Sequence, residues 1–235
     1  MQPFERILVP LDTTDVVWAV DLATRLQGHV GGIKLGKEFF TANGPQGVRQ
    51  VTGGGDQPLF LDLKFHDIPN TVAGAIRSAN KVGPFMLNVH ASGGRAMMEA
   101  AVAANAEAGA DQPILLAVTV LTSLDDEDLG DLGVSWTTED QVVRLAALAQ
   151  QSGMDGVVCS AKEITALRSA CGADFKLVVP GIRPAWAAAD DQKRIVTPAD
   201  AVAMGADYLV IGRPITGAAD AVGAAQRIGQ ELSET

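Results

Sequence analysis

Residues 61–71, LDLKFHDIPNT, combine an apolar strand pattern with a short exit loop before a proline. Three ionisable side chains, Asp62, Lys64 and Asp67, lie within this otherwise apolar stretch. Apolar strands that lead through a turn into a helix are the units of parallel sheets covered by helices. The stretch therefore predicts one strand and helix unit, with charged side chains where the strand ends.

Apolar runs of strand length recur along the chain, each followed by a turn and a longer segment with helical spacing. Eight such runs in 235 residues predict an α/β fold, a closed (β/α)8 TIM barrel, as a single domain over residues 1–235. A doubly wound open sheet ranks second, because no GxGxxG motif follows the first run. The runs are ILVPL (7–11), GGIKL (31–35), LFLDL (59–63), FMLNVH (85–90), ILLAVTVL (114–121), GVVCS (156–160), KLVVP (176–180) and YLVIG (208–212).

The segments between the runs carry helix and loop signals. Thr138 is predicted as a helix N-cap, and Thr197 followed by Pro198 marks a second helix start. The polar segments 44–58 and 121–138 are predicted as loops. The second of them follows the fifth run at its carboxyl end, where a barrel builds its active site. We therefore expect it to act as a mobile lid.

The composition excludes several classes of function. A hydrophobic content of 47% in 235 residues supports a full core and opposes disorder. The net charge of -10 would repel nucleic acid and anionic lipid, so an anionic ligand needs a local cluster of cations. We expect no nucleic-acid partner, no membrane partner and no signal peptide. Cys159 and Cys171 lie in apolar segments, which predicts free thiols in a reducing cytoplasm.

Charged residues lie at the ends of the first three predicted strands. Asp12 follows the first strand, and Lys34 lies near the end of the second. Asp62 and Lys64 share one face of the third strand, because side chains two apart point the same way. Taken alone, this pair could be a structural ion pair, and Asp67 matches a helix N-cap. Three consecutive charged strands instead favour a functional cluster at the mouth of the barrel.

The loops after the seventh and eighth strands are expected to bind an anion, because barrels of this type often hold a phosphate there. Gly212 offers a backbone N–H, and Arg213 offers a planar fork suited to phosphate oxygens. Arg183 and Gln192 lie on the loop after the seventh strand, which is predicted to close as a flap. A turn with a surface arginine is the alternative for Arg213, and a surface charge is the alternative for Arg183.

These residues belong to motifs that span nearly the whole chain. LDLKFHDIPNT is the most specific motif, and the others follow in order on successive strands. The other motifs are VPLD (9–12), GIKLGKEFF (32–40), VLTS (120–123), DGVVCSA (155–161), PGIRP (180–184), DQKRI (191–195) and DYLVIGRPIT (207–216). With all of these motifs, the chain resembles the orotidine 5'-phosphate decarboxylase family.

The resemblance implies an activity and a set of site residues. It implies decarboxylation of orotidine 5'-monophosphate to uridine 5'-monophosphate in pyrimidine biosynthesis, by a cytoplasmic homodimer without a cofactor or metal. Lys64 would protonate C6 beside Asp62, and Asp67 would come from the other subunit. The implied catalytic residues are Lys64, Asp62, Lys34 and Asp67. The implied substrate-binding residues are Asp12, Lys34, Thr71, Thr122, Arg183, Gln192, Gly212 and Arg213.

The chemistry of this reaction fits the charged residues. Loss of carbon dioxide leaves electrons in a ring orbital that nothing delocalises, so the protein must stabilise a localised carbanion with fixed charge. An ammonium group does this and also supplies a proton, and neighbouring carboxylates favour its charged form. Two rival interpretations remain. One is a metal-dependent sugar-phosphate decarboxylase or aldolase with a related Asp-x-Lys-x-x-Asp pattern, and the other is a phosphometabolite-binding barrel without catalysis.

Overall fold

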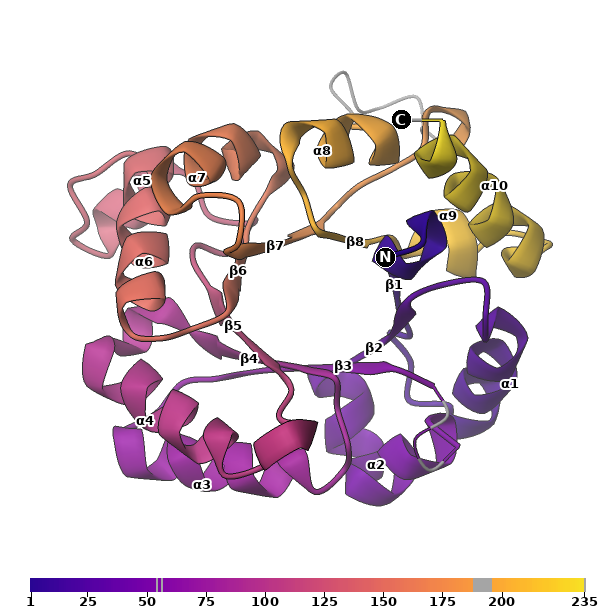
Figure 1. Ribbon diagram of the computed structural model, residues 1–235, viewed down its shortest axis with the longest axis horizontal. Helices are drawn as coiled ribbons and strands as arrows, with labels where there is room; N and C mark the ends of the chain where they lie inside the picture. Colours follow the sequence, from indigo (N-terminus) through magenta and orange to yellow (C-terminus); the bar gives the residue numbers. More distant parts are fainter. Residues whose placement is uncertain (54, 56, 188–195, 235) are drawn as a thin grey trace.

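The computed structural model describes residues 1–53, 55, 57–187 and 196–234. Eight parallel strands pair in chain order, and the pairing of β1 with β8 closes the barrel (Figure 1). The (β/α)8 barrel predicted from the apolar runs is confirmed. The strands are β1 (Ile7–Pro10), β2 (Gly32–Gly36), β3 (Leu59–Phe65), β4 (Met86–His90), β5 (Ile114–Val118), β6 (Gly156–Val158), β7 (Lys176–Pro180) and β8 (Tyr208–Val210).

Helices surround the outer face of the barrel (Figure 1). No helix within the described ranges is long and apolar enough to cross a membrane. The helices are α1 (Val16–Leu26), α2 (Lys37–Val51), α3 (Pro69–Asn80), α4 (Arg95–Ala106), α5 (Asp126–Asp131), α6 (Thr138–Gln151), α7 (Ile164–Cys171), α8 (Pro198–Met204), α9 (Arg213–Thr216) and α10 (Ala221–Ser233).

The apolar core has two layers, because successive side chains of a strand point to opposite faces. On β3, Leu59 and Leu61 belong to the large outer cluster that includes buried residues of the helices, whereas Phe60 belongs to the inner cluster. Asp62 follows at the carboxyl end of the inward-facing row. Burial of each large apolar side chain stabilises the fold by about 1.5–3 kcal/mol. The inner cluster consists of Leu8, Phe60, Met86, Leu116, Val178, Tyr208 and Val210.

The prediction of a loop over residues 44–58 is wrong for its first part, which is helical. Helix α2 continues to Val51 after a kink at Gly44, where φ is 59° and ψ is -166°. Glycine adopts this left-handed φ without steric cost. Pro45 then begins the second part of the helix, at a position where its missing N–H and fixed φ are tolerated. The non-helical backbone at Gly44 therefore separates two helical parts of α2, and Pro45 begins the second.

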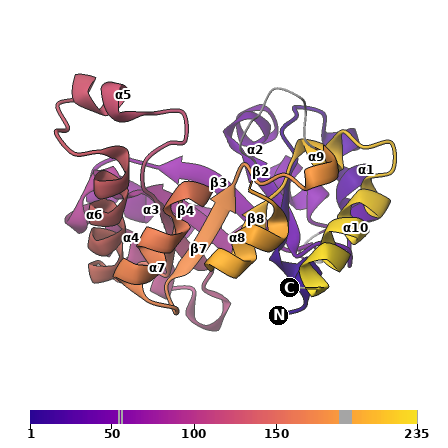
Figure 2. The same cartoon turned by 90° about the horizontal axis from the view of Figure 1, so that it is seen from above.

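The segment 121–138 contains helix α5 and is not a continuous loop. The Asp125 side chain accepts hydrogen bonds from the backbone N–H groups of Glu127 and Asp128, which caps the first turn. Such a cap is worth about 1 kcal/mol. Figure 2 shows that α5 projects away from the rest of the chain, connected through extended loop on both sides. Its function as a mobile lid stays a prediction.

Two predicted N-caps have different outcomes. Thr197 caps α8, as predicted, and its hydroxyl accepts a hydrogen bond from the N–H of Asp200. Thr138 is not the N-cap of α6, because Thr137 holds that position. The hydroxyl and backbone N–H of Thr138 instead donate to Asp126, at 2.6 and 2.7 Å. These bonds attach the start of α6 to α5.

Candidate active site

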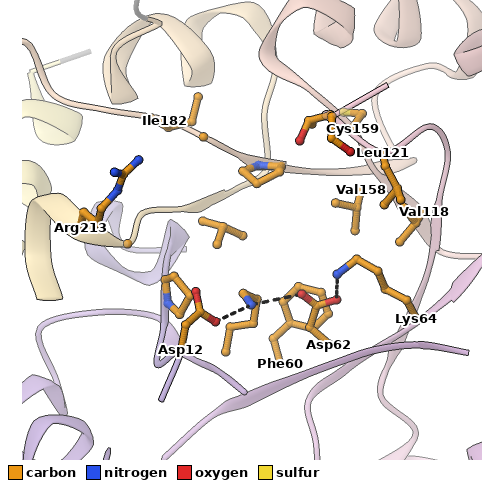
Figure 3. A pocket seen from close by; sticks show the side chains of 18 of the residues that line it. Asp12, Phe60, Asp62, Lys64, Val118, Leu121, Val158, Cys159, Ile182 and Arg213 are labelled. Atoms are coloured by element: carbon orange, nitrogen blue, oxygen red, sulfur yellow. Dashed lines mark hydrogen bonds and ion pairs between the residues drawn. The ribbon is translucent and has the colours of Figure 1, made fainter. Parts of the chain in front are cut away.

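A cavity of about 470 Å³ opens at the carboxyl ends of the strands. Apolar side chains line part of it, including Phe60, Val118, Val158 and Ile182 (Figure 3). The structure brings together around it eight residues that the sequence singled out. They are Asp12, Lys34, Asp62, Lys64, Thr122, Arg183, Gly212 and Arg213.

Four charged side chains form a row of alternating sign along one side of the cavity (Figure 3). Lys34 Nζ lies 3.5 Å from Asp12 Oδ1 and 3.2 Å from Asp62 Oδ2. Lys64 Nζ lies 2.5 Å from Asp62 Oδ1. Asp62 is therefore shared between two ammonium groups. These four residues form three linked ion pairs and line a cavity. The arrangement therefore favours a functional cluster over an isolated structural ion pair.

Lys64 occupies an irregular part of β3. Its φ is 51°, and it is the only non-glycine residue with positive φ in the described part of the chain. β3 pairs with β4 up to Leu61 and again at Phe65, but the register shifts in between. Residues 62–64 therefore lie opposite Asn88 alone. Backbone strain of this kind costs about 1–3 kcal/mol and is common at functional sites.

Asn88, on β4, contacts the charged row. The sequence patterns did not identify it as a site residue. It is 1% exposed. Its Nδ2 donates to Asp62 Oδ1 at 2.6 Å, and its Oδ1 accepts from the backbone N–H of Lys64 at 2.7 Å. An amide residue in the middle of the apolar run FMLNVH could have indicated it, because a buried polar side chain requires hydrogen-bond partners.

The surroundings of Asp62 keep its carboxyl ionised. Burial alone would raise the pKa of Asp62, but Lys34, Lys64 and the hydrogen bonds from Lys64 and Asn88 together hold that pKa below its usual value. At the end of β4, burial lowers the pKa of His90 to about 4, and the nearby His66, Lys37 and Lys64 act in the same direction. His90 is therefore neutral at pH 7 and contributes no positive charge to the row.

Two arginines and a glycine also line the cavity. Arg213 begins α9 directly after Gly212, and Arg183 lies in the loop after β7. Figure 3 shows Arg213 across the cavity from Lys64. A Cβ atom at Gly212 would lie 3.1 Å from Pro10 Cγ, so glycine allows this loop to pack closely against β1. The arrangement suits an elongated anion with one end at each cluster of charges.

Comparisons with known proteins identify the family to which this chain belongs. A sequence model of the orotidine 5'-phosphate decarboxylase / HUMPS family matches residues 5–228. The chain belongs to this family. A protein from Rhodospirillum rubrum, named orotidine 5'-phosphate decarboxylase, is 59% identical over 230 residues, which cover 96% of this chain and 93% of the relative. The match confirms the resemblance found in the motifs.

Two further relatives of the family extend the comparison. A protein of the same name from Moorella thermoacetica is 51% identical over 237 residues, covering 99% of this chain and 94% of the relative. The crystal structure of orotidine 5'-phosphate decarboxylase from Lactobacillus acidophilus has a TM-score of 0.85 and 36% identity, covering 96% of this chain and 98% of that chain. Sequence and fold therefore agree over nearly the full length.

Two of the residues that the decarboxylase resemblance implied, Asp67 and Thr71, do not line the cavity. Both are exposed. Asp67 Oδ1 accepts a hydrogen bond of 2.6 Å from the backbone N–H of Ile68, and Asp67 forms no ion pair with a described residue of its own chain. The interpretation of Asp67 as a helix N-cap is wrong, because Ile68 holds that position and Pro69 begins α3.

Gln192 lies outside the described residues. The described part of the same loop, 181–187, is attached to α10 through Trp186. Its Nε1 donates to Glu231 Oε1 at 2.7 Å, and the guanidinium of Arg227 lies 4.5 Å from the centre of its ring. A cation over an aromatic face contributes about 0.5–1 kcal/mol at an exposed site. These contacts fix one end of the loop that the family resemblance assigns to phosphate binding.

Proposed function

We propose that this protein decarboxylates orotidine 5'-monophosphate to uridine 5'-monophosphate, a step of pyrimidine biosynthesis. The observation that carries the proposal is the alternating row of charges, with the amine of Lys64 in a cavity that has Arg213 across from it. The relatives named orotidine 5'-phosphate decarboxylase support the same activity. A nucleotide fits this arrangement, with its base at the row and its phosphate at the arginines.

Lys64 is the proton donor in this mechanism. The bond between C6 and the carboxylate carbon breaks, carbon dioxide leaves, and the electron pair of that bond stays on C6. The Lys64 ammonium stabilises this carbanion by its charge and then donates a proton to form the C6–H bond. The neutral amine regains a proton from solvent. Because these charges are held in place before the reaction, no reorganisation is needed as the carbanion forms.

Asp62 acts mainly by holding the Lys64 ammonium in place. Repulsion of the substrate carboxylate by Asp62 is too weak to explain catalysis by itself. Two like charges about 4 Å apart repel by about 4 kcal/mol at an effective dielectric constant of about 20. Enzymes commonly remove about 8–23 kcal/mol of a barrier. Most of the rate enhancement is therefore assigned to stabilisation of the carbanion.

The remaining site residues bind the nucleotide away from the reacting carbon. Thr122 contacts the edge of the pyrimidine, and Asp12 and Lys34 bind the ribose hydroxyls. Binding of the phosphate closes the loops around the substrate. Part of this binding free energy thereby lowers the barrier to reaction at C6. The proposed phosphate ligands are Arg183, Gln192, Gly212 and Arg213.

Asp67 and Thr71 are proposed to act in the active site of the other subunit of a homodimer. Both side chains are exposed and lie outside the cavity of their own chain. The adjacent Ile68 is 67% exposed. A second copy of the chain that covers Ile68 would bring Asp67 towards the partner's charged row.

Mixing two inactive variants tests the shared site. Lys64→Ala and Asp67→Ala enzymes should each be inactive, and their mixture should recover up to about one quarter of wild-type activity. In the mixed dimer, one site has an intact Lys64 and receives an intact Asp67 from the partner. A mixture of Lys64→Ala with Asp62→Asn is the control, because both residues belong to the same subunit and no intact site forms. Absence of recovery after verified subunit exchange contradicts the dimeric site.

Turnover in the presence of a chelator distinguishes the proposed reaction from the metal-dependent rival. Within the described residues, no cluster of three His, Cys, Asp or Glu side chains is arranged to hold a metal ion. We expect the change in ultraviolet absorbance of orotidine 5'-monophosphate to proceed at an unchanged rate in excess EDTA. Loss of turnover that magnesium restores would favour a sugar-phosphate decarboxylase or aldolase mechanism instead.

The cytoplasm is the proposed location of the protein. Both cysteines, Cys159 and Cys171, are free and buried. Burial raises the pKa of Cys171, which keeps it a neutral thiol at pH 7. Free thiols of this kind persist in a reducing compartment. Decarboxylase activity should therefore appear in the cytosolic fraction of fractionated cells.

A further inference from the structure

We propose that Asn88 is a positioning residue for the decarboxylation, which holds Asp62 and Lys64 in their working geometry. This inference rests on the proposed function. Asn88 does not line the cavity, and its side chain is buried behind the charged row. It acts through the two residues that it contacts and has no direct contact with substrate.

The two hydrogen bonds of Asn88 fix the orientation of its carboxamide. Its Oδ1 faces an N–H donor, and its Nδ2 faces a carboxylate oxygen. The two partners make opposite demands, since one requires an acceptor and the other requires a donor. Among side chains of this size, only asparagine meets both demands at neutral pH. Aspartate lacks the donor, and leucine lacks both groups.

The first bond supports the strained backbone at Lys64. Because residues 62–64 lie opposite a single residue of β4, the regular strand ladder is interrupted there. A buried backbone N–H without a partner is costly, so the Asn88 oxygen substitutes for the missing acceptor. The same contact holds Lys64 at its left-handed φ of 51°, which lysine does not favour. Without it, the backbone would relax and the amine would shift relative to Asp62.

The second bond fixes the Asp62 carboxylate between its neighbours. Asp62 Oδ1 accepts from both Lys64 Nζ and Asn88 Nδ2, while Oδ2 faces Lys34. Donation from Asn88 favours the ionised form of Asp62. Loss of this donor should raise the pKa of Asp62 and leave the carboxylate free to rotate. The other titratable groups near it are Lys34, Lys64 and the neutral His90.

Asn88→Ala tests the inference against a matched control. We expect kcat to fall about 10- to 100-fold, the factor associated with one hydrogen bond to a charged group. Affinity for uridine 5'-monophosphate should remain within about threefold, because the phosphate ligands are unchanged. The control is Asn105→Ala, since Asn105 is 2% exposed and donates to the Pro113 carbonyl at 2.8 Å, outside the cavity. Its loss should lower Tm without changing kcat.

A second variant, Asn88→Asp, keeps the size of the side chain and is useful if Asn88→Ala does not fold. It keeps the acceptor for Lys64 but places a second carboxylate against Asp62. We expect low kcat at neutral pH and a partial recovery as the pH falls, because a proton shared by two carboxyl groups restores the lost donor. A variant that is impaired only in stability would keep the wild-type pH profile.

Titration of the Asp62 carboxyl by NMR provides a measurement that does not require activity. Its pKa should be higher in Asn88→Ala than in the wild type. Unchanged kcat and unchanged Asp62 titration in the Asn88 variants would overturn the inference. An equal loss of kcat in Asn105→Ala would also overturn it. If Lys64→Ala retained activity, the proposed proton donor would be wrong, but the Asp62 titration would still decide the function of Asn88.

Discussion

Substitution of Lys64 by alanine is expected to lower kcat for orotidine 5'-monophosphate by more than about 10⁴-fold. The amine has two functions, as the fixed charge that stabilises the carbanion and as the donor of the proton. Loss of fixed charge at a reacting centre commonly costs about 10²–10³ in kcat, and loss of a general acid costs about 10²–10⁴. The decrease in ultraviolet absorbance at saturating substrate measures this effect.

Lys81→Ala is the matched control for this variant. Lys81 is an exposed lysine that follows α3, and it does not line the cavity. Its removal changes net charge by the same amount and should leave kcat unchanged. Retention of more than about one tenth of wild-type kcat by Lys64→Ala would contradict its assignment as the proton donor.

Substitution of Asp62 by asparagine is expected to lower kcat by about 10²- to 10³-fold. The change keeps the shape of the side chain but removes the anion that separates Lys34 from Lys64. Loss of one preorganised electrostatic group at a reacting centre commonly costs about 10²–10³ in kcat. The two ammonium groups should then repel each other and move apart. Steady-state kinetics at several substrate concentrations separate the effect on kcat from that on KM.

Asp207→Asn is the control for Asp62→Asn, because Asp207 also lies between two cations. Its carboxylate pairs with Arg168 and Lys176. Asp207 directly precedes β8, so it lies at the end of the barrel opposite the cavity. This variant should lose stability but keep wild-type kcat. If Asp62→Asn lowers only Tm and leaves kcat intact, Asp62 is a structural residue.

The sequence predicted the barrel and the four residues of the charged row, because both depend on local patterns. Each apolar run identifies a strand by its own residues, and strand ends gather at one rim in any parallel barrel. Asp12, Lys34, Asp62 and Lys64 could therefore be assigned to one rim without a structure. The same reasoning failed for residues 44–51, where glycine and proline signals that are typical of loops lie at a kink between two helical parts of α2.

The geometry at Lys64 depends on pairing between strands and could not be predicted from local patterns. A regular β3 also places Asp62 and Lys64 on one face, so the register shift opposite Asn88 leaves no mark in the pattern of β3 itself. Taken alone, Asp67 matched a helix cap for a related reason. An aspartate near a helix start has the same sequence pattern whether it caps that helix or projects from the surface.

In the proposed mechanism, the Lys64 amine acts on the reacting carbon and is not needed to bind the nucleotide. Parallel measurements of turnover and of uridine 5'-monophosphate affinity on one preparation of Lys64→Ala test it most directly. We predict that turnover is lost while the Kd of this product changes by less than about tenfold, because the phosphate ligands lie across the cavity. Equal losses of turnover and of nucleotide affinity would contradict the claim.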